Sequence, residues 1–305
     1  MFVRMRTNRF FRTNRFFLAV MPAVAVAAWA VAVPAHASAC PPRVQTMYIT
    51  GVDDRYQIHT DGQLRAGLVR ITFDNDGTGD HEAQLFLLHD GVSFAQFKAD
   101  LLAGKPAAFS TDAAPRGGAA AISAGHDQVL FEALQGGTYA VACFVRDKNG
   151  VPHFAMGMLT SFSVAGHLSA AQLAGLRPAR RTDGQISAHD MTFTMPAVLR
   201  AGGLYRFRNT DRVDDHQVNV ARLLPGKTVA DALAWFRSPA GPPPFVSSGG
   251  FGADTPGGLG GWFILNARPG NYVAFCLVVD PDTGRSHAAM GMVAGFRVTA
   301  DGSRS

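Results

Sequence analysis

The chain has 305 residues, 47% of them hydrophobic and 17% charged, which is enough for about two domains with substantial cores. Five of its 28 Lys and Arg residues lie in the first 17 positions, and the remaining 23 balance the 23 Asp and Glu residues. The basic pI is therefore largely a property of the leader, and a nucleic-acid-binding function has no support. The 33 glycines, scattered through turn-like stretches, favour many short strands over long helices.

The first 39 residues are expected to be an export signal. A basic segment without acids (MFVRMRTNRFFRTNRFF) precedes an apolar run (FLAVMPAVAVAAWAVAV) and small residues in an A-x-A pattern (PAHASA). These features predict a secretory signal peptide cleaved near Ala37 or Ala39. Two alternatives stay open, an uncleaved membrane anchor and a lipid-modified Cys40. We therefore expect the protein to be exported, to the periplasm, the extracellular space or the cell envelope.

After the leader, segments with apolar residues at every second position predict strands. In the first half these are LVRITFDN, HEAQLFLL, TYAVACFV and TSFSV. One segment in each half has apolar residues at helical spacing instead, SFAQFKADLLAG and TVADALAWFRS. Each predicted helix is followed by a stretch rich in Gly and Pro, KPAAFSTDAAPRGG and PAGPPPFVSSGGFGADTPGGLGG, which we expect to be a loop.

The chain repeats itself. Both halves contain L-R-A-G, then F-x-N, a short polar loop, and a histidine that opens an apolar-alternating run; both continue with G-x-Y-x3-C and H-x4-M. His216 follows His81 by 135 residues, and Cys276 follows Cys143 by 133. So constant an offset indicates tandem copies of one domain. The expected organisation is a leader (1–39), a first domain (40–165), a linker with one or two helical turns (166–183), a second domain (184–300) and a tail (301–305).

Each copy thus holds two histidines, a cysteine and a methionine in the same order. Two imidazoles, a thiolate and a thioether are a soft ligand set that suits copper, in particular a trigonal His2Cys centre with a long axial Met. The turn-rich stretches RDKNGVP and DPDTG would let the chain return after the cysteine, so that His and Met face it. The candidate metal ligands are His81, Cys143, His153 and Met158 in the first copy, and His216, Cys276, His287 and Met292 in the second.

Each copy resembles a cupredoxin, the blue-copper fold, over most of the chain after the leader. G-x-Y-x3-C is similar to the strand that leads into the family's copper cysteine, and H-x4-M to the last two ligands of many members. The resemblance implies a mostly β protein of two tandem Greek-key β-sandwich or barrel domains, each with a short helical insertion and one copper. The C-x9-H and C-x10-H spacings exceed those of small members and are nearer those of copper nitrite reductases.

Several alternatives stay open. A disulfide between Cys143 and Cys276 would need two strand ends to meet across a domain interface. Met156 or Met290 could be axial by sequence alone, although the spacing favours Met158 and Met292. Five further histidines have no matching pattern and are expected to be solvated or structural: His59, His89, His126, His167 and His189. The whole scaffold could also be a metal-free extracellular interaction module.

The neighbours of the two cysteines bear on catalysis. Two-domain nitrite reductases have a histidine directly before the copper cysteine, and multicopper oxidases have H-C-H. Here Ala142 and Phe144 flank Cys143, and Phe275 and Leu277 flank Cys276. We therefore expect no enzyme but a protein that carries electrons or handles copper, with a redox partner protein or a copper donor or acceptor as its partner. Membrane contact is expected only through an uncleaved leader or a lipidated Cys40.

Overall fold

The computed structural model describes residues 44–105 and 107–300. The expected signal peptide, Cys40 and the tail lie outside these ranges. Among the described residues, no helix has the length and apolar character needed to cross a membrane.

The first half contributes eight strands and three short helices to the described part of the chain. Their order is β1 (Gln45–Val52), β2 (Arg55–Thr60), β3 (Gly67–Asn75), β4 (His81–Leu88), α1 (Phe94–Leu102), α2 (Ala107–Ser110), β5 (Ala113–Ile122), β6 (Asp127–Leu134), β7 (Gly137–Ala142), α3 (His153–Met156) and β8 (Leu159–Val164). A short helix, α4 (Ala170–Gly175), follows in the predicted linker and carries a capping box of Ser169 and Gln172.

The second half follows the same plan within the described ranges. Its elements are β9 (Gly184–His189), β10 (Thr192–Thr194), β11 (Val198–Arg200), β12 (Leu204–Asn209), β13 (His216–Leu223), α5 (Val229–Arg237), β14 (Phe245–Asp254), β15 (Gly261–Ile264), β16 (Gly270–Phe275), α6 (His287–Met290) and β17 (Val293–Thr299). The two predicted helices are confirmed as α1 and α5, and both begin with a side-chain N-cap, Ser93 and Thr228.

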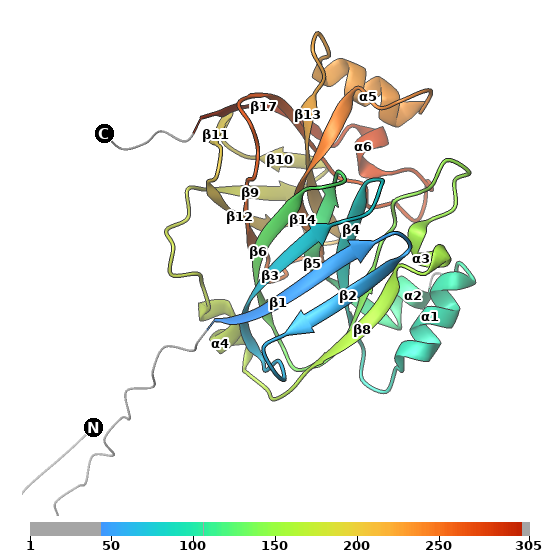
Figure 1. Ribbon diagram of the computed structural model, residues 1–305, viewed down its shortest axis with the longest axis vertical. Helices are drawn as coiled ribbons and strands as arrows, with labels where there is room; N and C mark the ends of the chain where they lie inside the picture. Colours follow the sequence, from blue (N-terminus) through green and yellow to red (C-terminus); the bar gives the residue numbers. More distant parts are fainter. Residues whose placement is uncertain (1–43, 106, 301–305) are drawn as a thin grey trace, which may run out of the picture. The chain divides into compact units, whose positions relative to one another are not determined.

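Two sheets run through both halves and form a sandwich. One has the order β10-β9-β12-β15-β6-β3-β1-β2, and the other β11-β17-β16-β13-β14-β5-β4-β7-β8. Apart from β11, each sheet consists of four strands of the first half on one side of its centre and their four counterparts of the second half on the other side. From the centre outward, the two sets follow the same order. The hairpin β1–β2 (blue in Figure 1) lies at one edge. The predicted mostly β fold with a helical insertion in each repeat is confirmed.

The halves join through strands that the sequence pattern did not reveal. The stretches expected to be Gly/Pro-rich loops contain most of β5 and β14, two ten-residue strands that pair with each other at the centre of the larger sheet. Gly118 and Gly250 explain the error. Both have positive φ, and a Cβ there would lie 2.1 Å from the Ala83 carbonyl oxygen and 2.0 Å from that of Val218. Glycine permits these irregular pairings and close backbone approaches.

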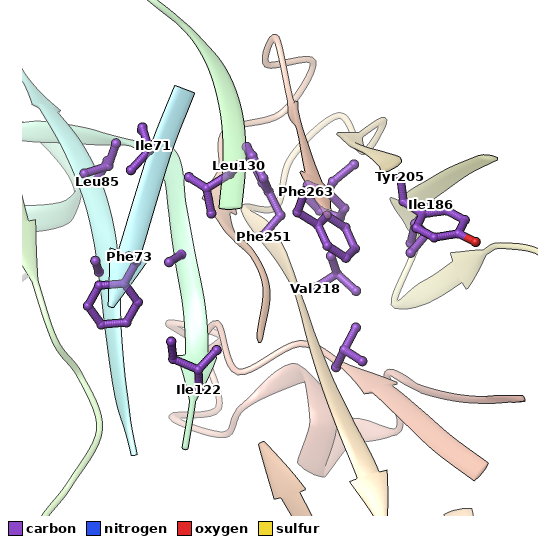
Figure 2. Packing of buried hydrophobic residues seen from close by; sticks show 14 of the residues in the cluster. Ile71, Phe73, Leu85, Ile122, Leu130, Ile186, Tyr205, Val218, Phe251 and Phe263 are labelled. Atoms are coloured by element: carbon purple, nitrogen blue, oxygen red, sulfur yellow. The ribbon is translucent and has the colours of Figure 1, made fainter. Parts of the chain in front are cut away.

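One hydrophobic core continues across the join. It includes Leu130 of the first half with Phe251 and Phe263 of the second, and Figure 2 shows these side chains in one packed cluster. Strand β4 is buried on both faces, because its outer face, with Phe86 and Leu88, packs against α1 and α2. Burial on both sides fixes the start of β4, where His81 lies, in a rigid setting.

Candidate metal centres

The predicted ligands of the first half meet at one end of three neighbouring strands; we call this group site 1. His81 opens β4, Cys143 directly follows β7, His153 begins α3, and Met158 directly precedes β8. Strand β4 is antiparallel to β7, and β7 is antiparallel to β8, so the start of β4, the end of β7 and the start of β8 lie together. In the second half β13, β16, α6 and β17 place His216, Cys276, His287 and Met292 in the same way and form site 2.

In site 1 the donor atoms form a small triangle. The Nδ1 atoms of His81 and His153 are 3.0 Å apart, and the Cys143 Sγ lies 4.0 Å from the first and 3.6 Å from the second. All three residues are buried. Two imidazole nitrogens this close cannot both carry a proton on the facing side, so at least one presents a lone pair.

Site 2 repeats the triangle. The Nδ1 atoms of His216 and His287 are 3.1 Å apart, and the Cys276 Sγ lies 3.8 Å and 3.5 Å from them. In each triangle, the point equidistant from the three donor atoms lies about 2.0–2.1 Å from each, close to the ~2.0–2.1 Å of metal–imidazole and ~2.3 Å of metal–thiolate bonds. An ion fits between the side chains as they stand, and the nitrogen and sulfur donors suit copper.

The methionines separate into an inner and an outer pair. Met158 and Met292 are fully buried, whereas Met156 and Met290 are 41% and 36% exposed. The inner methionines are tied to the sites by backbone bonds, since the N–H groups of Met158 and Met292 donate to the carbonyls of the histidines at 3.0 Å and 2.8 Å. Each site is therefore a His-Cys-His-Met set, with the methionine that the H-x4-M spacing favoured.

The residues between the cysteine and the second histidine form a closed turn, so the long spacing does not separate the candidate ligands in space. In site 1 the chain leaves after Cys143 and closes on itself through an antiparallel bridge between Arg146 and Pro152. Asp147 Oδ1 holds the turn by accepting the N–H groups of Asn149 and Val151. The His153 N–H then donates to the Val145 carbonyl at 2.9 Å, opposite the start of the excursion.

The second excursion closes in the same way. Val279 bridges to Ser286, and Asp280 Oδ1 accepts the Thr283 N–H at 2.7 Å. The His287 N–H donates to the Val278 carbonyl at 2.9 Å. The extra residues of C-x9-H and C-x10-H thus lie in turns outside the ligand cluster.

The metal-free ligands are neutral. Burial raises the pKa of the Cys276 thiol to about 12, and burial together with the Glu82 charge raises that of Cys143 well above its usual range. Burial also lowers the pKa of His81 and His287. A metal ion that binds here must therefore displace the thiol proton, which makes affinity depend on pH.

The surroundings of the two sites differ in charge. After the first histidine, site 1 has Glu82, whose pKa burial raises to about 6, whereas site 2 has Gln217. The Tyr56 hydroxyl donates to the Glu82 carbonyl and interacts with the Cys143 thiol. By strand register the residue matching Tyr56 in the second half is Phe193, which has no hydroxyl. A phenol thus lies beside the thiol of site 1 alone, and Glu82 supplies a carboxylate where site 2 has the amide of Gln217.

The first histidine of site 2 has its own carboxylate partner. His216 Nε2 lies 3.2 Å from Asp211 Oδ2. Asp211 is held by hydrogen bonds from backbone N–H groups, including those of Val213 and Asp190, and these bonds place its pKa well below the usual range. It is therefore ionised over the whole physiological range.

A buried row of hydrogen bonds connects the two sites. The Phe144 N–H donates to Glu82 Oε1 at 2.8 Å, and Gln84 Nε2 donates both to Glu82 Oε2 at 3.1 Å and to Gln217 Oε1 at 3.0 Å. The Gln217 N–H then donates to Cys276 Sγ at 3.5 Å. We call the side chains of Glu82, Gln84 and Gln217 the bridge. The bridge connects the backbone of Phe144, the residue after Cys143, to the Sγ of Cys276.

Sequence reasoning did not find Asp211, Tyr56 or Gln84. Asp211 lies in the polar loop after F-x-N, where any acid looks solvated, and Tyr56 is in a strand that the alternation did not single out. A signal did exist for Asp211: the F-x-N asparagine anchors that loop, since the Asp211 N–H donates to Asn209 Oδ1 at 3.0 Å. An asparagine that occurs at the matching place in both halves, Asn75 and Asn209, indicates an ordered loop.

Cys143 and Cys276 are both free, so no disulfide joins them. Over residues 44–105 and 107–300, the two triangles are the groups of three or more His, Cys, Asp or Glu side chains that could hold an ion. The remaining histidines lie outside both groups; His59, for example, is near Asp61 at the surface.

The chain was compared with known proteins. No family model and no curated protein matches it. Among solved structures, it is similar to auracyanin B (18% identity over 38% of this chain and 86% of that one, TM-score 0.26). It is also similar to a multicopper oxidase (15%, 84% and 89%, TM-score 0.23) and to the copper-containing nitrite reductase of Thermus scotoductus SA-01 (12%, 84% and 61%, TM-score 0.21).

The class of protein follows from the molecule itself. Each half has a two-sheet β-sandwich with the same strand order, and at one end of three of its strands a buried His-Cys-His-Met set whose donor atoms are spaced for a single ion. That combination defines a cupredoxin-like domain with a type 1 copper-like site. The chain is a tandem cupredoxin-like protein with two such sites, one per half.

Proposed function

We propose that this protein is an exported electron carrier that holds one copper ion in each half. The observation that carries the proposal is the pair of buried triangles, each with two Nδ1 atoms and one Sγ atom spaced for one ion. Bound copper supplies one-electron chemistry between Cu(I) and Cu(II). The buried ligands lie in or next to packed strands and short helices, and such rigidity keeps rearrangement small when the charge of the site changes.

The bridge supports a paired role for the sites. It gives them a continuous connection of covalent and hydrogen bonds through the protein interior, from Phe144 to Cys276. In this proposal an electron taken up at one site can be shared with the other. Buried, fully bonded polar groups of this kind are kept in fixed positions.

The proposal is a carrier and not an oxidase or a nitrite reductase. Phe144 lies in an aromatic cluster with Phe86 and Phe154, and Phe275 packs against Phe236 and Phe245. These flanking rings fill the space beside each cysteine and offer no donor atom for a further metal. Apolar side chains thus replace the histidines that a second type of copper centre would need.

The partner in this proposal is a redox protein, or a copper donor or acceptor, that meets the ligand loops. Val151 and Met156 are exposed in the loop that carries His153, and Val279 and Met290 in the loop that carries His287. Exposed apolar side chains close to a buried redox site suit a short-lived contact with another protein. The basic and apolar leader supports export as the setting of that contact.

Copper loading tests the proposed function. The mature chain is reduced, loaded with Cu(II), and its visible spectrum and copper content are recorded. We expect two copper ions per chain and an intense thiolate-to-copper band that falls by half in Cys143→Ser or Cys276→Ser and vanishes in the double variant. A folded, reduced protein that binds no stoichiometric copper would refute the proposal. Exchange of electrons with a small redox protein then separates a carrier from a copper store.

A further inference from the structure

The two sites are repeated in sequence but differ at the outer nitrogen of their first histidine. In site 2, His216 Nε2 lies 3.2 Å from Asp211 Oδ2. The matching position in site 1 is Gly77. Both residues come two positions after the F-x-N asparagine, and both N–H groups donate to its Oδ1, at 3.0 Å for Asp211 and 3.1 Å for Gly77. The two backbone positions are therefore equivalent, and one of them has a carboxylate that the other lacks.

Gly77 leaves no room for such a carboxylate. A Cβ on Gly77 would lie 2.4 Å from His81 Nε2, inside any allowed contact. The backbone of site 1 thus approaches the ring so closely that a side chain cannot be accommodated. A side chain at position 77 would therefore displace the His81 ring from its present place.

Asp211 is held as a fixed acceptor. Its side chain is 6% exposed. Oδ1 accepts the N–H groups of Arg212, Val213 and Asp214 at 2.6, 2.8 and 3.2 Å, and Oδ2 accepts that of Asp190 at 2.8 Å. With these bonds satisfied, Oδ2 faces His216 with one lone pair left. The proton of a neutral imidazole is then placed on Nε2, which leaves Nδ1 free to face Cys276 and His287.

Site 1 has no such constraint. The Nδ1 atoms of His81 and His153 are 3.0 Å apart, so in the metal-free protein one ring can donate its Nδ1 proton to the other. Either ring of site 1 can be that donor, whereas in site 2 Asp211 makes His216 the acceptor and leaves His287 as the donor. The ligands of site 1 are also slightly more open, with His153 at 8% exposure against 1% for His287.

We propose that Asp211 is a positioning residue that holds His216 ready for metal, so that site 2 fills first and releases its ion last, while site 1 is the exchangeable site. This inference rests on the proposed copper binding. The proposal gives the two repeats different roles although their candidate ligand residues are of the same types.

Single-site proteins test the proposal through affinity. Cys143→Ser leaves only site 2 and Cys276→Ser leaves only site 1, and each is titrated with Cu(I) against a chromogenic chelator. We expect the site 2 protein to bind more tightly, and Asp211→Asn to weaken it by about 10–100-fold, the usual effect of removing a partner of a metal-bound histidine. Asparagine keeps an Oδ1 for the three loop N–H groups, but its Nδ2 can accept neither from His216 Nε2 nor from the Asp190 N–H.

Asp183→Asn is the matched control, because Asp183 also accepts a backbone N–H, from Leu204, and bonds Arg200 away from either site. It should leave copper affinity unchanged. Equal affinities of the two single-site proteins, a comparison that needs no Asp211 variant, would overturn the proposal. So would a folded Asp211→Asn protein with unchanged affinity at site 2.

Nitrogen NMR of the metal-free protein provides a readout that does not depend on copper. We expect the His216 ring to be the Nε2–H tautomer in the native chain and to become a mixture in Asp211→Asn. A His216 ring that is already a mixture in the native chain would overturn the inference. Because no metal is added, this result remains informative if copper binding itself fails, so the two failures can be told apart.

Discussion

Replacing Gln84 by methionine removes the centre of the bridge while keeping the length and volume of the side chain. Gln84 is 3% exposed, and its amide bonds Glu82, Gln217 and, through Oε1, the Ala253 N–H at 2.8 Å. Methionine leaves three buried polar groups without this partner. At about 1–3 kcal/mol for each, less what the apolar side chain regains by burial, the expected loss in unfolding free energy is about 4 kcal/mol.

Equilibrium unfolding of the reduced, metal-free protein in urea measures this loss. Gln128→Met is the matched control, because Gln128 is equally buried and also joins the halves, to Gly250 and Ile264, but touches neither site. Both variants should be destabilised. Only Gln84→Met should show coupling with Gln217→Met in a double-mutant cycle, by about 0.5–3 kcal/mol. Additive effects of Gln84→Met and Gln217→Met would refute the bridge.

Three further predictions concern single residues. Gly118→Ala should lower the unfolding free energy by more than about 4 kcal/mol, because the new Cβ would meet a backbone carbonyl of β4. Gly125→Ala is the control, since Gly125 also has positive φ but lies in open space, and it should cost about 1–2 kcal/mol. Equal losses for the two variants would contradict the close strand contact. Burial raises the pKa of Glu132 from 4.5 to about 8, so the folded state keeps a proton that the unfolded state has lost, and stability falls as pH rises through this window. Glu132→Gln should remove up to about 5 kcal/mol of that fall, and parallel pH profiles of unfolding for the native and variant chains would contradict this prediction. Glu82→Gln should raise the reduction potential of site 1, measured in a Cys276→Ser background, because it removes a buried negative charge that favours Cu(II). Voltammetry that shows no shift, or a fall, would contradict this electrostatic explanation.

The repeat is what identified the candidate ligands, and the structure brings them together in two groups. His81 alone would have been one of ten histidines, but its partner 135 residues later, in the same order with Cys and Met, identified it. The alternation of HEAQLFLL predicted β4, and helical spacing predicted α1 and α5. These are local signals, which depend only on the pattern of side chains along a short segment.

The central strands could not be predicted in the same way. Residues 113–122 and 245–254 contain glycines at positive φ, which normally mark loops, yet here they let β5 and β14 pass close to neighbouring backbone. Their pairing depends on contacts between halves that are more than 100 residues apart. Asp211 was missed for a related reason: the preceding asparagine indicates an ordered loop, but the bond to His216 on which the role of Asp211 depends is created by the loop conformation.

X-ray absorption at the copper edge of the fully loaded chain tests the central claim most directly. The triangles predict two nitrogen ligands at about 2.0 Å and one sulfur ligand at about 2.3 Å for each copper, with two copper ions per chain and one in either single-cysteine variant. A first shell of oxygen and nitrogen without sulfur, or copper that remains bound when both cysteines are replaced by serine, would contradict the account.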